Sequence, residues 1–374
     1  MAMVRRAAAA LTAAACSVAL VATPAAAEAN KSGHDPIQVV AKGLNGPFQL
    51  SQRHGRLYVL ESGAGRVTRI NTRTGSTTPV ITGLGADRAS GATPVGRKFA
   101  IVTGELSPED PAGPGPYPAS SVLIAKPGHK ARQLADLLKY ELRRNPDGQT
   151  QFGPDGKALD ALSNPFYVLR DRHRHGSLLV ADGGANDVLR VNGHGKVSTF
   201  FVVPTVNTGA CKGRPNNDPR HPGCDGVPTG LAYGPGNTLY VSALTGEAEG
   251  EGRIYVLNDS TGKLLRVIKG LTAPTGIAVD RRSGTVYVSE LIEGAPPLDG
   301  PLPEGFDPST IGQIVKIAPN GQRSYAQVTL PTGLLLKDGK LYASAWSVAG
   351  LLLGVQDAGQ VVKVSRSAFV AASS

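Results

Sequence analysis

Acidic residues close short apolar stretches at four places in the chain. Glu61, Asp182 and Glu290 end the stretches RLYVLE, LLVAD and VYVSE, and Glu105 ends KFAIVTGE. If these stretches are equivalent strands of a repeated unit, their carboxylates gather at one end of the fold, where oxygen donors suit Ca²⁺ or another hard cation. Such acids are equally suited to capping turns and to pairing with a nearby arginine such as Arg66. Both interpretations remain open.

A spacing similar to that of a calcium-binding loop follows the stretch LLVAD. Asp182, Asn186 and Asp187 stand at the start of this segment, but its twelfth position is Gly193 instead of the Glu that an EF-hand requires. The intervening Gly-Gly pair predicts a tight turn with positive φ. Asn186 and Asp187 are therefore suited either to forming this turn or to binding a ligand.

No nucleophile or metalloprotease motif accompanies these acids. The chain contains no G-x-S-x-G, no H-E-x-x-H and no Gly-rich phosphate loop between a strand and a helix. The sequence therefore predicts no catalytic residue and favours a binding protein over an enzyme.

The first 27 residues have the organisation of an export signal. Two arginines precede an apolar run at residues 7–21, and three alanines then provide a small-residue cleavage site before Glu28. We expect residues 1–27 to be a signal peptide, residues 28–36 to be a leader, and the product to be secreted. The sequence does not distinguish Sec from Tat export.

Two cysteines remain in the exported part, within CKGRPNNDPRHPGC. An even pair outside the cytoplasm predicts a disulfide between Cys211 and Cys224. On the chain-entropy model such a bond stabilises the fold by roughly 3 kcal/mol. A zinc site is less favoured, because only His221 lies nearby and no second cysteine pair exists.

The composition excludes several classes of protein. Of 374 residues, 41% are hydrophobic and 18% are charged, and the net charge is +10. After the signal sequence no apolar run reaches the ~18 residues that a membrane helix needs, so no membrane span is expected. The basic residues are scattered and not interleaved with aromatic residues, which argues against nucleic-acid binding. The positive charge serves either solubility or attraction to anionic polymers of a cell envelope.

An internal repeat predicts the fold. Each copy begins with an apolar strand, a turn containing Gly and a second strand, and a further segment with period-2 apolar residues follows. The six copies begin near Pro47, Pro94, Pro165, Pro228, Pro274 and Pro331. With an outer strand after most copies, each unit has four strands, named a to d from the axis outwards. Six such units form an all-β, six-bladed β-propeller, which we expect as a single domain over residues 37–370.

The two ends of the repeat region complement each other. The sixth copy provides strands a, b and c only, whereas IQVVAKGLNGP near the N-terminus matches LLRVIKGLTAP, which contains the d strand of the fourth copy. We predict that residues 37–42 form the outer strand of the sixth blade, which leaves no exposed sheet edge where the ring closes. The alternative is a disordered N-terminal segment.

The sequence also resembles a known family. The blocks SNPFYV, LLVADGGANDVLRV, GVPTGLAYG and YVSALTG resemble the ScyD/ScyE family of secreted bacterial propellers, and more loosely the NHL and SMP-30/gluconolactonase-like propellers. This resemblance implies the fold and export but no established reaction. In gluconolactonase-like propellers a divalent metal helps to open a sugar lactone, and Asp182 falls where their b-strand aspartate stands. The resemblance thus implies one divalent cation, such as Ca²⁺, at Asp182 with an amide oxygen from Asn164 or Asn45.

The positions of the long segments predict where a ligand binds. In an up-and-down blade the d–a and b–c connections share one face, and all six long segments are connections of these two kinds. They are residues 106–119, 138–163, 205–226, 244–251, 291–311 and 346–358. Because binding residues concentrate on loops of a rigid scaffold, the ligand site is expected at the channel mouth on this face. Its predicted residues are Glu61, Glu105, Asn164, Asp182, Asn186, Asp187 and Glu290.

We therefore expect a monomeric, secreted binding or scaffold protein. Its partner is a small molecule, a carbohydrate or a cell-envelope polymer. The alternative is a metal-dependent hydrolase of sugar lactones.

Overall fold

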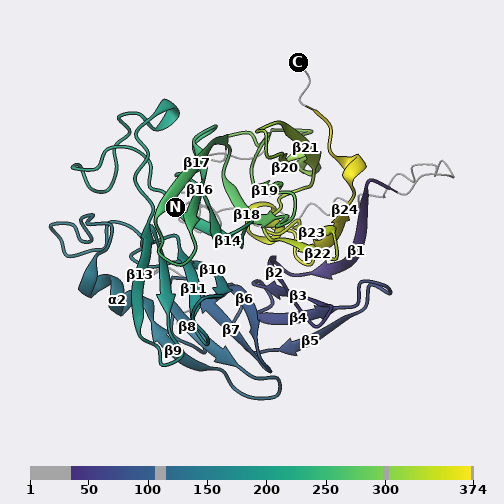
Figure 1. The fold of residues 1–374 in the computed structure, drawn as a ribbon, viewed down its shortest axis with the longest axis horizontal. Coiled ribbons are helices and arrows are strands. Elements are labelled where there is room, and N and C mark those ends of the chain that lie inside the picture. The colour runs from purple at the N-terminus through teal and green to yellow at the C-terminus, as the bar shows by residue number, and fades with distance from the viewer. Residues whose placement is uncertain (1–34, 106–114, 298–302, 372–374) are drawn as a thin grey trace.

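A computed structural model describes residues 35–105, 115–297 and 303–371. The predicted signal peptide and most of the predicted leader lie outside these residues. The described chain forms six antiparallel sheets of four strands each, arranged as a ring (Figure 1). The fold is a six-bladed β-propeller, as the repeat predicts.

In five blades the strands follow one another in chain order from the axis outwards. Blade 1 contains β2 (Pro47–Arg53), β3 (Arg56–Glu61), β4 (Arg66–Ile70) and β5 (Thr77–Ile81). Blade 2 contains β6 (Ala89–Val95), β7 (Lys98–Thr103), β8 (Ser121–Ala125) and β9 (Arg132–Asp136). Blade 3 contains β10 (Pro165–Arg170), β11 (Leu178–Asp182), β12 (Asp187–Val191) and β13 (Val197–Val202). Blade 4 contains β14 (Pro228–Tyr233), β15 (Thr238–Ala243), β16 (Gly252–Asn258) and β17 (Leu264–Leu271). Blade 5 contains β18 (Pro274–Val279), β19 (Val286–Glu290), β20 (Gln313–Ile317) and β21 (Arg323–Gln327).

Blade 6 joins the two ends of the propeller. It contains β22 (Leu334–Lys337), β23 (Lys340–Ala345) and β24 (Gly359–Val364), and its outer strand is β1 (Ile37–Leu44). Strands β1 and β24 pair antiparallel, with Ile37 opposite Val364 and Leu44 opposite Gly359. The predicted closure is confirmed, and the strand extends two residues beyond the predicted end at Lys42.

The hydrophobic core lies between neighbouring blades. Successive side chains of a strand point to opposite faces of its sheet, and in the inner strands both sets are apolar, so a sheet packs against the sheets on both sides: in β11, Leu178 and Val180 face blade 2, and Leu179 and Ala181 face blade 4. Between blades 3 and 4, for example, Leu179 and Val188 share a cluster with Leu239 and Tyr255, all at most 1% exposed. Truncating a side chain of this kind to Ala typically costs about 2–5 kcal/mol. The core therefore fixes the blades rigidly beneath the connecting loops.

The repeated Pro-Thr-Gly segment ties the innermost strands together near the axis. The Thr hydroxyl of one blade donates to the carbonyl oxygen of the first Pro in the next, namely Thr229 to Pro274 (3.0 Å), Thr275 to Pro331 (3.1 Å) and Thr332 to Pro47 (3.1 Å). Glycine follows because the next strand lies so close: a Cβ on Gly276 would stand 1.9 Å from the Thr332 carbonyl oxygen. The repeat motif thus encodes the contact between blades.

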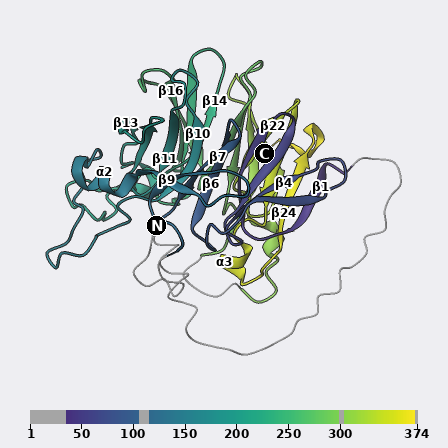
Figure 2. The same ribbon diagram turned by 90° about the horizontal axis from the view of Figure 1, so that it is seen from below.

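The d–a and b–c connections emerge on one face of the ring, here called the loop face. Figure 2 shows α3 (Ala349–Leu353) below the sheets on this face. The opposite face has short turns, including residues 171–177 between β10 and β11. Two segments expected as loops contain helices, α3 and α2 (Leu137–Arg144), and Asp136 caps α2 by accepting from the Lys139 N–H at 2.8 Å. Single 3-10 turns are η2 (Gly209–Cys211), η3 (Pro308–Thr310) and η4 (Arg366–Ala368).

Candidate functional site

Glu61 is held inside its own blade. Its buried carboxylate accepts from Arg66 Nε at 2.8 Å and Arg66 Nη2 at 2.9 Å, and also from the Thr68 hydroxyl. The Asn45 backbone N–H donates to the same carboxylate at 3.0 Å. Glu61 therefore holds the d–a connection before blade 1 in place. It also forms the ion pair with Arg66 that the sequence analysis gave as the alternative to cation binding.

Asp182 and Glu290 fasten the equivalent connections of blades 3 and 5. Asp182 accepts from Ser163 Oγ and the Asn164 N–H, both at 2.6 Å, and more weakly from the N–H groups of Gly184 and Ala185. Burial nevertheless raises the pKa of Asp182 to about 6. The carboxylate of Glu290 accepts from the Thr272 N–H at 2.7 Å and from Gln313 at 2.6 Å, and burial raises its pKa.

Glu105 does not close a strand. Strand β7 ends at Thr103, which pairs with Ala89 at the position equivalent to Glu61 in blade 1. Glu105 lies two residues further on, in the b–c connection, where its N–H donates to Asn164 Oδ1 at 3.2 Å. Asn164 thus contacts Asp182 through its backbone N–H and not through its amide oxygen.

Two aromatic rings lie at the loop-face end of the axis. Phe48 and Phe166 occupy the position of the ring-closing Thr in blades 1 and 3, and they stack with centroids 6.1 Å apart and planes at 14°. Both side chains are half-buried. Phe48 also packs against a cluster from the b–c connections of blades 5 and 6, which includes Ile311 and Trp346. Among the described residues, aromatic and apolar side chains thus gather at this end of the axis.

Asp187 lies in a buried group of carboxylates that we call the acid cluster, formed by Glu141, Asp147, Asp182 and Asp187. Asp187 is fully buried beside Asp182 on the neighbouring strand, and neither of its carboxylate oxygens has a hydrogen-bond partner in the part of the chain that the structure describes. Oε2 of Glu141 is likewise buried and unpartnered there. Burial, followed by the charges of Asp182, Glu141 and Asp147, raises the pKa of Asp187 well above its ordinary value.

The acid cluster includes two residues that the sequence analysis missed. Burial and the Asp147 carboxylate raise the pKa of Glu141 to about 8, and burial also raises that of Asp147. Asp147 accepts from Asn186 Nδ2 at 3.1 Å, and Asn186 has the positive φ of 51° expected for a turn residue. No motif marks Glu141 or Asp147, because they reach blade 3 only through the folding of a long connection.

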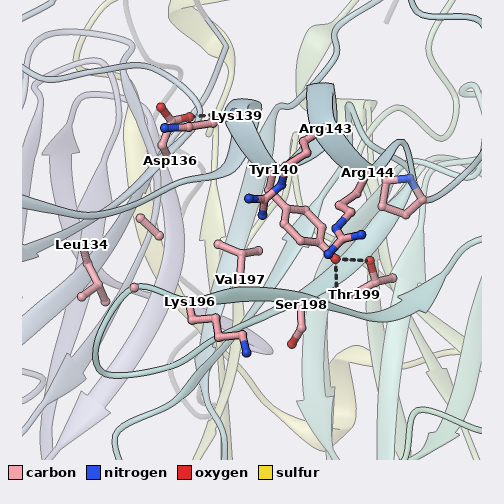
Figure 3. Close-up of a pocket in the computed structure, with 13 residues that line it drawn as sticks. Leu134, Asp136, Lys139, Tyr140, Arg143, Arg144, Lys196, Val197, Ser198 and Thr199 are labelled. Atoms are coloured by element: carbon pink, nitrogen blue, oxygen red, sulfur yellow. Dashed lines mark hydrogen bonds between the residues drawn. The ribbon is translucent and has the colours of Figure 1, made fainter.

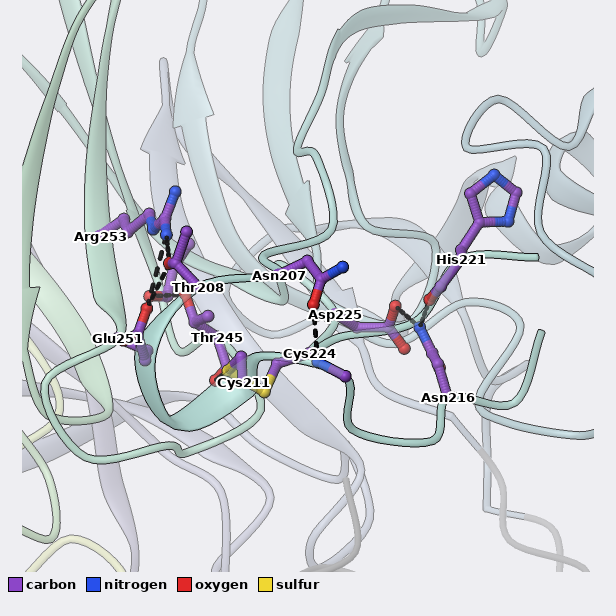
Figure 4. The surroundings of a disulfide bond; sticks show 12 residues. Asn207, Thr208, Cys211, Asn216, His221, Cys224, Asp225, Thr245, Glu251 and Arg253 are labelled. Carbon is purple, nitrogen blue, oxygen red and sulfur yellow. Dashed lines mark hydrogen bonds and ion pairs between the residues drawn. A yellow bond between two sulfur atoms is a disulfide. The ribbon is translucent and has the colours of Figure 1, made fainter. Parts of the chain in front are cut away.

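A polar cap covers the acid cluster. It is formed by the connections 138–163 and 205–226, which are joined by the Thr150 N–H donating to Asp218 at 2.8 Å and by Gln149 donating to Asp225 at 2.7 Å. The predicted disulfide between Cys211 and Cys224 is present, with Cα atoms 5.3 Å apart (Figure 4). In the same view Asn216 donates to Asp225 at 2.9 Å.

A cleft of about 660 Å³ lies on the other side of α2, between this helix and β13. We call it the cationic cleft, because Lys139, Arg143, Arg144 and Lys196 line it (Figure 3). Its wall is fixed by Tyr140, whose hydroxyl accepts from the Thr199 N–H at 2.9 Å and lies 2.9 Å from Thr199 Oγ1. Ser198, Leu134 and Val197 also line it.

The described parts of the chain contain neither a preformed metal site nor a helix that could cross a membrane. No three or more His, Cys, Asp or Glu side chains there are already arranged to hold a metal ion. The helices described are too short or too polar to cross a bilayer. The cation predicted at Asp182 with Asn164 stays a prediction. Among the described residues of this region, Asp187 lacks a partner for both carboxylate oxygens and Glu141 for one.

The chain matches no protein-family model and no curated protein. Among solved structures it is similar to a luciferin-regenerating enzyme (TM-score 0.53, 11% identity, covering 90% of this chain and 96% of that one). It is also similar to the PQQ-bound aldose sugar dehydrogenase from Streptomyces coelicolor (TM-score 0.53, 13% identity, 87% and 97% covered). A third neighbour is a glucose dehydrogenase-type oxidoreductase from Thermus thermophilus (TM-score 0.50, 15% identity, 87% and 98% covered). At these identities the similarity shows the propeller fold alone.

Proposed function

We propose that the protein is a secreted binding propeller of the ScyD/ScyE type whose ligand site lies at the channel mouth on the loop face. The observation that carries this proposal is the half-buried stack of Phe48 and Phe166 at the axis. In blades 4 to 6 a Thr hydroxyl occupies this position and bonds to the next blade. The two rings replace such bonds with an apolar surface.

The chemistry of this surface suggests the class of ligand. Aromatic faces pack against the apolar face of a sugar ring or of another small molecule. The acids near the mouth serve a different purpose, because Glu61, Asp182 and Glu290 accept hydrogen bonds that hold the connections in place. Recognition is therefore expected to rest on Phe166 and Phe48, with the carboxylates positioning the loops around them.

Export is supported by the disulfide between Cys211 and Cys224, a bond typical of oxidising compartments. The alternative, metal-dependent lactone hydrolysis, gains no specific support. The two groups it would use, the Asp182 carboxylate and the Asn164 amide oxygen, each already accept a hydrogen bond within the protein.

Isothermal titration calorimetry with a panel of neutral oligosaccharides and sugar lactones tests the proposal. Phe166→Ala should weaken the binding of any hit at least about tenfold, because stacking contacts of this size are lost. Arg281→Ala, at an exposed turn on the opposite face, is the control. Binding that survives Phe166→Ala but is lost in Arg281→Ala would refute the site. Lactone turnover abolished by a chelator would instead favour the hydrolase.

A further inference from the structure

Four cations line the cationic cleft and have no anionic partner in the part of the chain that the structure describes. The side chains of Lys139, Arg143, Arg144 and Lys196 are exposed, and none forms an ion pair or a side-chain hydrogen bond with another residue that the structure describes. Among the lining residues the one carboxylate is Asp136, which caps α2. The cleft is therefore strongly positive.

Stabilisation of the helix explains only part of this arrangement. Arg143 and Arg144 lie in the last turn of α2, where positive charge interacts favourably with the helix dipole. Lys139 lies in the first turn, where that interaction is unfavourable, and Lys196 belongs to the c–d turn of blade 3 and not to the helix. Two separate elements thus bring cations to one cleft, and helix stability does not account for them.

The walls of the cleft are fixed and chemically mixed. Tyr140 is 9% exposed, and its hydroxyl is bonded to Thr199 of β13, which holds α2 against blade 3. Between the cations, Val197 presents an apolar surface and Ser198 an exposed hydroxyl, both as lining residues. Figure 3 shows Lys196 and the two arginines of α2 on different sides of this surface.

We propose that the cationic cleft is a second binding site, for a carbohydrate chain that carries oxyanions. Arginine forks match the geometry of phosphate and carboxylate groups, and low-dielectric walls focus the field of unpaired cations. Its volume of about 660 Å³ lies within the usual range for ligand sites and accommodates sugar units in addition to the charged group. The hydroxyl and apolar walls suit a sugar ring. This site is independent of the proposed site at Phe166.

Two probes distinguish the source of the oxyanion, namely an oligosaccharide of phosphorylated mannose units and an oligogalacturonate. Calorimetry at about 50 mM salt should detect binding of at least one of them, and raising the salt to about 300 mM should weaken it at least tenfold. Neutral dextran should not bind at this cleft. The preferred probe identifies phosphate or carboxylate as the natural group. No binding of either probe would overturn the proposal.

Charge reversal locates the site. The double variant Arg143→Glu/Lys196→Glu should weaken binding of the preferred probe at least 30-fold, which is about 2 kcal/mol, because it removes two cations and adds repulsion. The matched control is Arg281→Glu/Arg282→Glu, two exposed arginines on a distant turn, and it should change affinity less than about twofold. The variant Arg143→Lys/Lys196→Arg should retain binding. Equal losses in both charge-reversal variants would mean non-specific attraction and would refute the cleft.

Discussion

The two faces of helix α2 hold charges of opposite sign that do not neutralise each other. On the inner face Glu141 belongs to the buried acid cluster, where burial and neighbouring carboxylates raise the pKa of Glu141 and of Asp187, and the charge of His221 acts on Asp147. On the outer face Lys139, Arg143 and Arg144 are exposed, and none of them forms an ion pair with another residue that the structure describes. Glu141 and the basic residues close to it in sequence are thus kept apart, because Glu141 is buried and the basic side chains are exposed. The buried carboxylates of the acid cluster are stable only when protonated or paired with a cation. The exposed basic side chains are solvated and available to a ligand.

The largest effect is expected where a buried acid is fully hydrogen-bonded. Asp182→Ala should lower the free energy of unfolding by roughly 4 kcal/mol, because it leaves the Ser163 hydroxyl and several backbone N–H groups without their acceptor. Asp187→Asn removes no hydrogen bond and should be at least as stable as the wild type near pH 8. Urea unfolding measures both. If the two variants lose equal stability, the distinction between these neighbouring acids is wrong.

The disulfide should stabilise the inner region and not the outer one. The double variant Cys211→Ser/Cys224→Ser should lose about 3 kcal/mol, since the closed loop is short. Hydrogen exchange should rise in the polar cap, while the blades remain folded and the affinity of the cationic cleft for its probe is unchanged. Mass spectrometry of the non-reduced wild type provides the check, because two free thiols there would contradict the bond.

The acid cluster should make stability depend on pH. The pKa of Glu141 is about 8 in the folded protein, so the folded state keeps a proton that the unfolded state releases above its ordinary value of 4.5. This contribution is complete below the unfolded pKa and is lost as the pH rises through about 8, by roughly 2 kcal/mol after allowance for solvent screening. Thermal unfolding from pH 5 to about 9 tests this. Glu141→Gln should flatten the profile, and an unchanged profile would show that Glu141 is not the responsible group.

A smaller effect is expected from Ca²⁺. A cation drawn to Asp187 and Glu141 replaces the missing protons near pH 8, and at about tenfold its dissociation constant it should stabilise the protein by roughly 1.4 kcal/mol. Asp187→Asn should abolish this gain, whereas Asp155→Asn, at an exposed acid of the same connection, should keep it. If wild-type protein shows no response to Ca²⁺ or to a chelator, no cation binds at Asp187 and Glu141, and protonation alone stabilises the cluster.

The features that the sequence predicts correctly are those encoded locally. The Pro-Thr-Gly copies predict the blades, the complementary end segments predict the closure of the ring, and the even cysteine pair predicts the disulfide. Each of these patterns can be recognised within a short stretch of sequence. Phe48 and Phe166 are also marked in the sequence, since GPF and NPF break the Pro-Thr-Gly pattern in blades 1 and 3, but the repeat alone does not predict that the two rings stack. Glu105 was misplaced because the apolar stretch KFAIVT is followed directly by Gly-Glu and hides the end of the strand at Thr103.

The acid cluster and the cationic cleft could not be predicted in the same way. Both depend on how connection 138–163 folds over blade 3, and its contacts with Asp218 and Asp225 join residues roughly 70 positions apart. The segment ADLLKYELRR does contain the apolar spacing of a helix, at Leu137 and Tyr140, so α2 was accessible from the sequence. The sequence does not show which charged side chains of α2 face inwards, because their orientation depends on tertiary packing.

The pairing of β1 with β24 also determines the order in which the protein can be assembled during synthesis. Ile37 is made among the first residues of the propeller and its partner Val364 among the last. Blades 1 to 5 can each complete their hydrogen bonds as they emerge, but blade 6 cannot do so until almost the whole chain has been delivered. Contacts between such distant residues form slowly. Until then the edge of β1 is open, and β24 has an open edge from its synthesis until it pairs, so this final step is when the nascent protein is most prone to pair with another copy.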